Sequence, residues 1–376
     1  RDNHTNYRKS EFTTGKVGRL FGKGLLFSNG DYWLQQRRLI QPGFHMKRIQ
    51  GLYKVMTDTI EKAITGWPAG KDVDIYPLVY QLAFDLILRS LFDLGLKPER
   101  KKEMSLLFNQ MQEFVVKDVN RPLRHLLYRI TRQDKINLRR SARMREIIRD
   151  VIRQRKQDTK EYADLLDMLL SARYEDTGEA MTEDQIIDEV LVILLAGHET
   201  TANTLSWMIS LVSSQPKVQA RLKTIAQTTD ICDSVRNDYI NAVINESMRL
   251  RPAAFMTDRV AMTDDRYGPW SFPKGTVMLS FFYGLHRHEG HWQHADVFLP
   301  DRWFDDTGKL RKMPAFFPFG AGPRLCIGNN FALAEMCFFV HAFFERFSIA
   351  PTGHTPNMLP LITLRPDKVL ISMYPV

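Results

Sequence analysis

The ten residues Phe319-Gly320-Ala321-Gly322-Pro323-Arg324-Leu325-Cys326-Ile327-Gly328 form the most informative stretch of this sequence. Two glycines and a proline predict a tight, non-helical loop that leads directly into a helix. Cys326 is therefore expected at a helix N-terminus, where free backbone N–H groups and the helix dipole stabilise a thiolate. A thiolate is the form of cysteine that binds iron. Arg324 suits a carboxylate on a ring that holds the iron, and Gly328 leaves room for that ring.

An inert, buried cysteine in a glycine-rich turn is the simpler interpretation of such a loop taken alone. The spacing is more specific, because all the fixed positions of Phe-x-x-Gly-x-Arg-x-Cys-x-Gly are filled, by Phe319, Gly322, Arg324, Cys326 and Gly328. This pattern resembles the haem-binding signature of the cytochrome P-450 superfamily. The resemblance implies a haem-thiolate monooxygenase in which Cys326 is the axial ligand of the iron of haem b. The other four residues would help to bind the cofactor.

Glu246 and Arg249 lie at positions i and i+3 of a predicted helix, where opposite charges can pair. Alone, such a pair is a common surface salt bridge. In the family that the cysteine loop resembles, a Glu-x-x-Arg pair joins a later arginine in a buried structural network, and Arg302 matches that arginine in order and spacing. Trp303 departs from the family, which commonly has phenylalanine there. Loss of one member would strand a buried charge, so we expect the network to stiffen the core.

The clearest predicted helix begins after Thr182, which can cap it in a capping box with Gln185, and ends near Val212 before Pro216. About 30 residues make a rod of roughly 45 Å, long enough to cross a whole domain. The resemblance implies that this helix passes over the haem.

The middle of this helix carries Ala196-Gly197-His198-Glu199-Thr200-Thr201. A glycine inside a helix costs about 1 kcal/mol relative to alanine, and here it is expected to let a ligand approach the backbone. Polar residues that solvate the helix, with threonine bonded to the preceding turn, are the common interpretation of such a motif. The resemblance implies instead that Glu199 and Thr200 are the acid–alcohol pair that relays protons to dioxygen.

Trp33 and Arg37 lie at i and i+4 near the start of the chain, on one face of a predicted helix. An indole and a guanidinium so placed can both donate hydrogen bonds to one carboxylate. The family uses a Trp-x-x-x-Arg pair in this way for a haem propionate, and Arg259 matches a further arginine near a propionate. The motifs together span residues 33 to 328, which is most of the chain.

Most of the sequence is predicted to be helical, because apolar residues recur at spacings of three and four. Alternating β-type segments are predicted between Phe255 and Phe282, with a turn at 273–275, and a small hairpin over 359–374. The sequence thus predicts one domain over residues 1–376, mainly α with a minor β part. The predicted helices besides the long one cover residues 49–67, 78–92, 101–116, 138–156, 163–172, 216–226, 238–250 and 327–347.

The composition, with 44% hydrophobic and 25% charged residues, is typical of a globular protein. The chain has a net charge of +9, and basic residues are scattered along a predicted helix face over 138–156. No nucleic-acid motif accompanies them, so no nucleic-acid partner is expected. Three cysteines are too few for a disulfide framework, which suits a reducing, cytoplasmic location. The polar opening at Arg1 looks like the inside of a domain, so an upstream segment with a membrane anchor stays open.

Four histidines within nine residues invite a zinc hypothesis: His286, His288, His291 and His294. Their spacings match neither the common zinc-finger nor the common protease pattern, so we expect no metal site there. His198 is expected to be an ordinary helix residue.

The resemblance also implies the reaction and its partners. One atom of dioxygen would enter a C–H or C=C bond of an apolar small molecule such as a fatty acid, terpenoid or steroid. No flavin- or nucleotide-binding motif is present, so a separate reductase or a ferredoxin- or flavodoxin-type donor would supply electrons, and an acidic one would suit the basic chain. The substrate is expected beneath the long helix, against an apolar lining made by Leu195, Ala196, Ala253, Ala254, Phe255 and Met256.

Two other classes of function stay open from the sequence. A haem-thiolate peroxygenase or isomerase needs no external electrons, and the Glu199–Thr200 pair argues against it. A non-catalytic haem sensor would have a second protein ligand on the iron and no turnover with any substrate. A requirement for NAD(P)H and a reductase, against turnover on peroxide alone, separates the first class from a monooxygenase.

Overall fold

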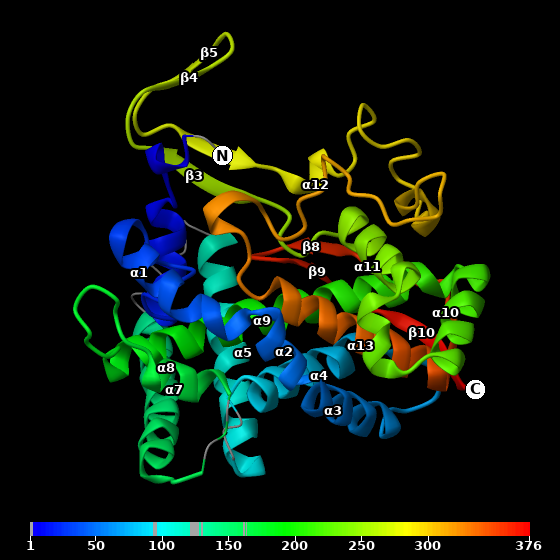
Figure 1. Cartoon of the computed structure of the whole chain (residues 1–376), viewed down its shortest axis with the longest axis horizontal. Helices are drawn as coiled ribbons and strands as arrows, with labels where there is room; N and C mark the ends of the chain where they lie inside the picture. The colour runs from blue at the N-terminus through cyan, green and yellow to red at the C-terminus, as the bar shows by residue number, and fades with distance from the viewer. Residues whose placement is uncertain (1–2, 93–95, 121–127, 129–130, 161, 163) are drawn as a thin grey trace.

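The computed structural model describes residues 3–92, 96–120, 128, 131–160, 162 and 164–376 (Figure 1). Helices make up most of the described chain and the strands are short, which confirms the prediction of a mainly α fold with a minor β part. Helix α9 (Glu183–Ser213) runs through the centre of the molecule (Figure 1). Most of its residues are buried, because it is apolar on nearly every side and is covered all round.

The predicted capping box starts α9. The Thr182 side chain accepts the backbone N–H of Gln185 at 3.2 Å, and the Gln185 side chain accepts the backbone N–H of Thr182 at 2.8 Å. Helix α4 (Ile75–Ser90) packs along α9. The other helices that matter below are α1 (Gly30–Ile40), α2 (Met46–Gly51), α3 (Tyr53–Thr65), α5 (Pro98–Asn120), α7 (Gln133–Gln157), α8 (Leu165–Ser171), α10 (Pro216–Thr228), α11 (Asp238–Leu250), α12 (Phe282–Leu285) and α13 (Asn329–Arg346).

The predicted helices agree with these elements within a few residues at most ends. The predicted helix over 49–67 was wrong as one piece, because α2 ends at Gly51 and α3 begins at Tyr53. Glycine is a poor helix former, which weakens the helix at that point. Residue 163, the first of another predicted helix, lies outside the described residues, and α8 follows it from Leu165.

Two antiparallel sheets flank the helices. One has the order β1 (Tyr7–Arg8), β3 (Thr257–Ala261), β6 (Val277–Ser280), and the other has the order β2 (Gly70–Asp74), β10 (Leu370–Pro375), β7 (Phe347–Pro351). Strands β4 (Asp265–Tyr267) and β5 (Trp270–Phe272) form a hairpin that projects from the molecule (Figure 1). The predicted strands between residues 255 and 282 are therefore confirmed.

The predicted hairpin over 359–374 was too long. Strand β8 (Met358–Pro360) pairs only with β9 (Leu364–Pro366), and the last strand, β10, pairs with β7 and β2 instead. Pro366 ends β9, because proline has no N–H to offer the ladder. The Asp74 side chain then accepts the Val369 N–H at 3.0 Å and directs the chain to β2.

Candidate active site around Cys326

The cysteine loop, residues 319–328, has the tight geometry that its glycines predict. Gly320 and Gly322 adopt φ values of +75° and +71°, a region that favours glycine. The Cys326 N–H donates to the Phe319 carbonyl at 2.9 Å, which closes the loop. Helix α13 begins at Asn329, so Cys326 lies within one turn before the helix N-terminus, close to its predicted position.

The Cys326 sulfur lies deep in the protein but remains accessible. Burial raises the pKa of the thiol, whereas the Gly328 N–H and the Arg37 charge lower it. By accessible surface Cys326 nevertheless counts as exposed. Cys326 is thus surrounded by many protein atoms while part of its surface stays accessible. The N–H of Gly328 and the charge of Arg37 both favour the thiolate in that place.

Four cations gather beside the loop, and we call Lys9, Arg37, Arg259 and Arg324 the cation cluster. Burial first, then the charges of Arg324 and Arg259, lowers the pKa of Lys9 to about 7. Burial, then Arg259 and Arg37, lowers the pKa of Arg324 to about 9. Like charges that depress one another's pKa values in this way would be stabilised by an added anion.

Neutral groups supply most of the hydrogen bonds of the cation cluster. Arg37 donates to the Leu325 carbonyl at 2.9 Å, and Lys9 donates to the Leu26 carbonyl at 2.6 Å. Arg324 donates to the Ser28 carbonyl at 3.0 Å, and its guanidinium lies 3.7 Å from the centre of the Trp33 ring.

The structure thus brings Trp33, Arg37, Arg259 and Arg324 together, as the sequence predicted, and adds Lys9. A nearby carboxylate, Asp258, partly offsets the cations by raising the pKa of Lys9 and of Arg259.

Two neighbouring carboxyls of α9 fix the loop that carries Leu26. The Lys23 N–H donates to Asp188 Oδ2 at 2.8 Å, and the Leu25 N–H donates to Glu189 Oε2 at 2.9 Å. Burial raises the pKa of Glu189 to about 8, so this carboxyl is protonated near neutral pH. Because Leu26 offers its carbonyl to Lys9, the two carboxyls also help to place the cation cluster.

One face of α9 is accessible in the middle of an otherwise buried helix. Ala196 is exposed and Thr200, one turn later, is partly exposed. Gly197 has a different purpose from the predicted one: a Cβ there would lie 2.7 Å from the Ile87 side chain of α4. The glycine therefore permits close packing of α4 on α9, and the accessible surface belongs to Ala196.

Glu199 and Thr200 are adjacent but have different partners. The Thr200 hydroxyl donates to the Ala196 carbonyl at 2.6 Å. The Glu199 carboxyl accepts hydrogen bonds from Gln112 at 2.8 Å and from the Thr363 hydroxyl at 2.6 Å. Burial raises the pKa of Glu199, and Thr363 is the strongest of the groups that lower it.

A second buried carboxyl, Glu335, lies on α13 beside α9. Burial raises its pKa well above the usual range, and a hydrogen bond from Thr201 lowers it. No motif in the sequence points to this residue.

The predicted ion pair is buried and larger than expected, and we call Glu246, Arg249, Arg302 and Trp303 the Glu246 network. Glu246 Oε1 accepts Arg249 at 2.8 Å and Arg302 at 2.9 Å. Glu246 Oε2 accepts a second Arg249 nitrogen at 2.9 Å and the Trp303 indole N–H at 3.0 Å. The tryptophan that departs from the family pattern thus adds a donor to the carboxylate.

The predicted substrate lining is only partly accessible. Ala254 and Met256 are exposed, whereas Ala253 and Phe255, which alternate with them, are buried. The backbone of this segment is held by hydrogen bonds from Leu364 and Tyr283. Leu195 is also buried, so on α9 the accessible surface lies at Ala196 and Thr200.

The histidine-rich run contributes to no group of three metal-ligating side chains in the part of the chain that the structure describes. His286 is buried and accepts the Phe317 N–H at 2.9 Å. His198 is also buried, and its Nε2 lies 2.9 Å from the Tyr80 carbonyl, so it stays within the helix packing.

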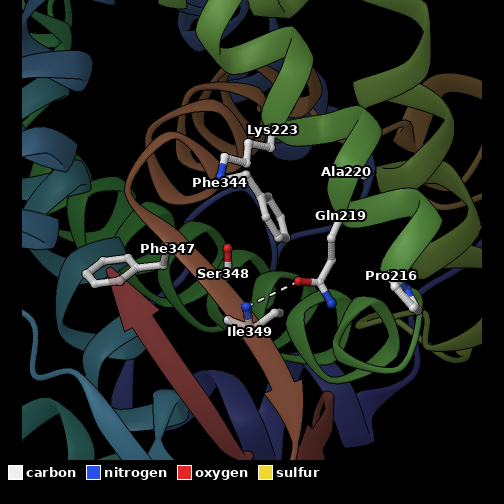
Figure 2. A pocket seen from close by; sticks show the side chains of 8 residues that line it. All are labelled: Pro216, Gln219, Ala220, Lys223, Phe344, Phe347, Ser348 and Ile349. Atoms are coloured by element: carbon white, nitrogen blue, oxygen red, sulfur yellow. Dashed lines mark hydrogen bonds between the residues drawn. The ribbon is translucent and has the colours of Figure 1, made fainter. Parts of the chain in front are cut away.

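A separate cavity of about 280 Å³ lies between α10 and the end of α13 (Figure 2). Figure 2 shows Gln219 accepting the Ile349 N–H, at 3.1 Å, on its wall. Cys326 precedes the other end of α13, a helix of 18 residues, which makes the separation roughly 25 Å. This cavity is therefore not part of the site around the cysteine.

No helix in the described ranges is long and apolar enough to cross a membrane. A family model described as "Cytochrome P450" matches residues 2–373. The cyclooctat-9-en-7-ol 5-monooxygenase of Streptomyces melanosporofaciens is 31% identical over 348 residues, which cover 90% of this chain and 75% of the relative. The pentalenene oxygenase of Streptomyces avermitilis is 28% identical over 310 residues, or 80% of this chain and 68% of the relative.

Solved structures agree on the fold. The crystal structure of the cytochrome P450DA heme domain superposes with a TM-score of 0.88 and is 23% identical. The match covers the whole of this chain and 85% of the other. At that identity the likeness shows the fold alone.

Proposed function

This chain belongs to the cytochrome P450 family, and from that premise we propose a role for each residue of the site. The protein is a haem-thiolate monooxygenase. It inserts one atom of dioxygen into an apolar organic substrate and takes its electrons from a separate redox partner.

The observation that carries the assignment of residues is the accessible Cys326 sulfur beside the cation cluster. A flat apolar ring with two carboxylates fits both features, so we assign haem b to this space, with Cys326 as the ligand of its iron. The haem, once bound, is where dioxygen binds and is reduced. Phe319, Gly322 and Gly328 shape the loop, and Trp33, Lys9, Arg37, Arg259 and Arg324 would bind the propionates.

Carbon monoxide tests this assignment directly. The reduced protein is expected to show the red-shifted absorption band of a thiolate-bound haem, and Cys326→Ala is expected to lose it. A wild-type protein without that band, or a variant that keeps the same spectrum, would contradict the assignment.

Glu199 and Thr200 form the proposed proton path. Thr200 lies on the accessible face of α9. There its hydroxyl can give up its hydrogen bond to the Ala196 carbonyl and bind a water molecule or dioxygen instead. Burial raises the pKa of Glu199, which favours uptake of a proton, and Gln112 and Thr363 hold its carboxyl in place. The carboxyl can then reload the hydroxyl through water.

Thr200→Ala is the first prediction. Haem should stay bound, but the product formed per NAD(P)H consumed should fall by roughly tenfold or more, because general acid catalysis contributes at least that much. The measurement is oxidised cofactor against product in one assay. Unchanged coupling would remove Thr200 from the proton path.

We propose a terpenoid substrate, since the two relatives named above act on cyclooctat-9-en-7-ol and, by its name, pentalenene. An apolar molecule suits the accessible apolar positions Ala196, Ala254 and Met256. A binding screen that follows the haem absorption shift with terpenoids, steroids and fatty acids tests this. A shift with fatty acids alone would contradict it.

An acidic ferredoxin- or flavodoxin-type protein is the proposed electron donor, because the chain carries a net charge of +9. Turnover on peroxide alone, without reductase, would point to a peroxygenase instead. We place the protein in a reducing, cytoplasmic compartment, since its three cysteines are free. Residues 1–376 are proposed to act as one domain, because Arg324 bonds to Ser28 near the other end.

A further inference from the structure

His286 is a wholly buried histidine to which the proposed reaction gives no part. It directly follows α12, and its ring lies 5.2 Å from the Phe316 ring and 6.2 Å from the Phe282 ring, measured between centres. Buried polar groups are normally hydrogen-bonded, so the partners of this residue indicate what it is for.

The backbone carbonyl and the ring of His286 bond to different parts of the molecule. Its carbonyl accepts Arg249 Nη1 at 2.9 Å, which joins it to the Glu246 network. Its ring Nε2 accepts the backbone N–H of Phe317 at 2.9 Å. A ring nitrogen can accept only when the imidazole is neutral. Burial first, then the charges of Arg249 and Arg287, lowers the pKa of His286 to about 4, which keeps the ring neutral.

Phe317 is where the chain enters the cysteine loop. Its carbonyl accepts the Gly320 N–H at 3.2 Å, in the turn that opens the loop. Two residues later, the Phe319 carbonyl accepts the Cys326 N–H at 2.9 Å. The neighbouring Phe316 ring packs 4.6 Å from the Trp303 ring, centre to centre. Ring contacts of Phe316 and Phe317 and one hydrogen bond from the Phe317 N–H therefore hold the entry, and His286 accepts that bond.

We propose that His286 is a positioning residue: its ring holds the Phe317 N–H and so fixes the loop that presents the Cys326 sulfur. The inference rests on the proposed role of Cys326 as the iron ligand. His286 acts through the backbone, from the rigid Glu246 network to the turn at Gly320. Without the acceptor, the Phe317 N–H is unpaired where it is partly buried, and other loop conformations become competitive.

Two variants of similar length separate the hydrogen bond from the packing. His286→Gln keeps an acceptor at the end of the side chain, whereas His286→Met has a similar length and only a weak one. His341→Met is the control, because His341 is also buried and its Nε2 lies 3.0 Å from a backbone carbonyl, that of Thr229, outside the cysteine loop.

The first readout is the thiolate band of the reduced carbon monoxide complex during a urea titration, with circular dichroism recorded alongside. His286→Met is expected to lose the thiolate band while its helices are still native. The wild type, His286→Gln and His341→Met are expected to lose band and helices together. Coincident loss in His286→Met, or early loss in His286→Gln as well, would overturn the proposal.

The second readout is amide hydrogen exchange of the peptide that contains Phe317. Exchange there is expected to be roughly tenfold faster in His286→Met and near wild type in His286→Gln. Equal protection in both variants would contradict the proposal. If the wild type itself lacks the thiolate band, the role of Cys326 fails instead, and exchange still reports on the His286 bond.

Discussion

The Glu246 network and the cation cluster both gather arginines, buried in the first and partly buried in the second, but their partners differ. In the Glu246 network, one fully buried carboxylate accepts hydrogen bonds from two arginines and a tryptophan. In the cation cluster, four cations rely mainly on backbone carbonyls and a ring, and they depress the pKa values of Lys9 and Arg324.

The charges of the first cluster stabilise the fold, whereas those of the second are available to a ligand. The Glu246 network is complete with the protein's own groups, so it stabilises the fold whether or not a ligand is present. The cation cluster is unfavourable alone and becomes favourable when carboxylates bind. Clustered arginines therefore stabilise this protein in one place and prepare it for a cofactor in the other.

The largest change in stability is expected when Glu246 is removed from the Glu246 network. Glu246→Leu leaves Arg249 and Arg302 buried without their carboxylate, which should cost about 3–5 kcal/mol in the free energy of unfolding. Urea denaturation followed by circular dichroism measures it. A loss of less than about 1 kcal/mol would show that the network is not a stabilising element.

Trp303→Phe is the matched control for that prediction. It restores the residue common in the family and removes the 3.0 Å indole bond to Glu246 together with part of a buried ring. The expected loss is about 1–3 kcal/mol, from one hydrogen bond and a small cavity, and therefore smaller than that of Glu246→Leu.

Arg324→Gln tests the role of the cation cluster in haem binding. Haem should be released roughly tenfold faster to a haem-scavenging protein, because a charge-assisted bond to a propionate is lost. The unfolding of the haem-free protein should be unchanged or slightly more difficult, because one repelling charge has gone. Arg221→Gln, at an arginine about half exposed, is the control and should change neither quantity. A loss of stability without faster haem release would show that the cation cluster stabilises the fold, as the Glu246 network does, and does not serve haem binding.

Lys9 should make haem binding depend on pH, with a smaller effect. The pKa of Lys9 is about 7 in the folded protein against an ordinary value of 10.5. A propionate would raise it again, so binding takes up a proton above pH 7 and weakens as pH rises from about 7 towards 10.5. Haem release should accelerate a few-fold over that range in the wild type. Lys9→Met should remove this part of the slope, and Lys9→Arg should remove it while keeping the charge.

An identical pH slope in the wild type and in Lys9→Met would mean that Lys9 does not face a propionate. The same linkage applies to the haem-free fold. Its stability should rise with pH between these two values, because the unfolded chain binds the proton that the folded chain has lost.

Local patterns in the sequence were enough for the cysteine loop, the capping box and the Glu246–Arg249 pair. Each of these depends on neighbours within about ten residues, so a short pattern is enough to predict it. Arg302 was placed by resemblance, and the structure brings it to Glu246.

Lys9, Gln112 and Thr363 were missed because their contacts join distant parts of the chain. Gln112 reaches Glu199 across 87 residues and Thr363 reaches it across 164, and no short pattern records such pairs. Gly197 was noticed for the wrong reason, since its neighbour Ile87 belongs to another helix. Short patterns in the sequence point to the residues that are proposed to carry the chemistry, but not to the distant residues that hold them in place.

The bond between Arg324 and the Ser28 carbonyl joins residues 296 positions apart. Most of the chain has therefore been synthesised before both residues of this contact exist. Segments made early, including Lys9 and Trp33, must therefore wait for the cysteine loop before the pocket can close. Capture of the cofactor is then among the last events of biogenesis, and a chain truncated before residue 326 would have the cations without the sulfur.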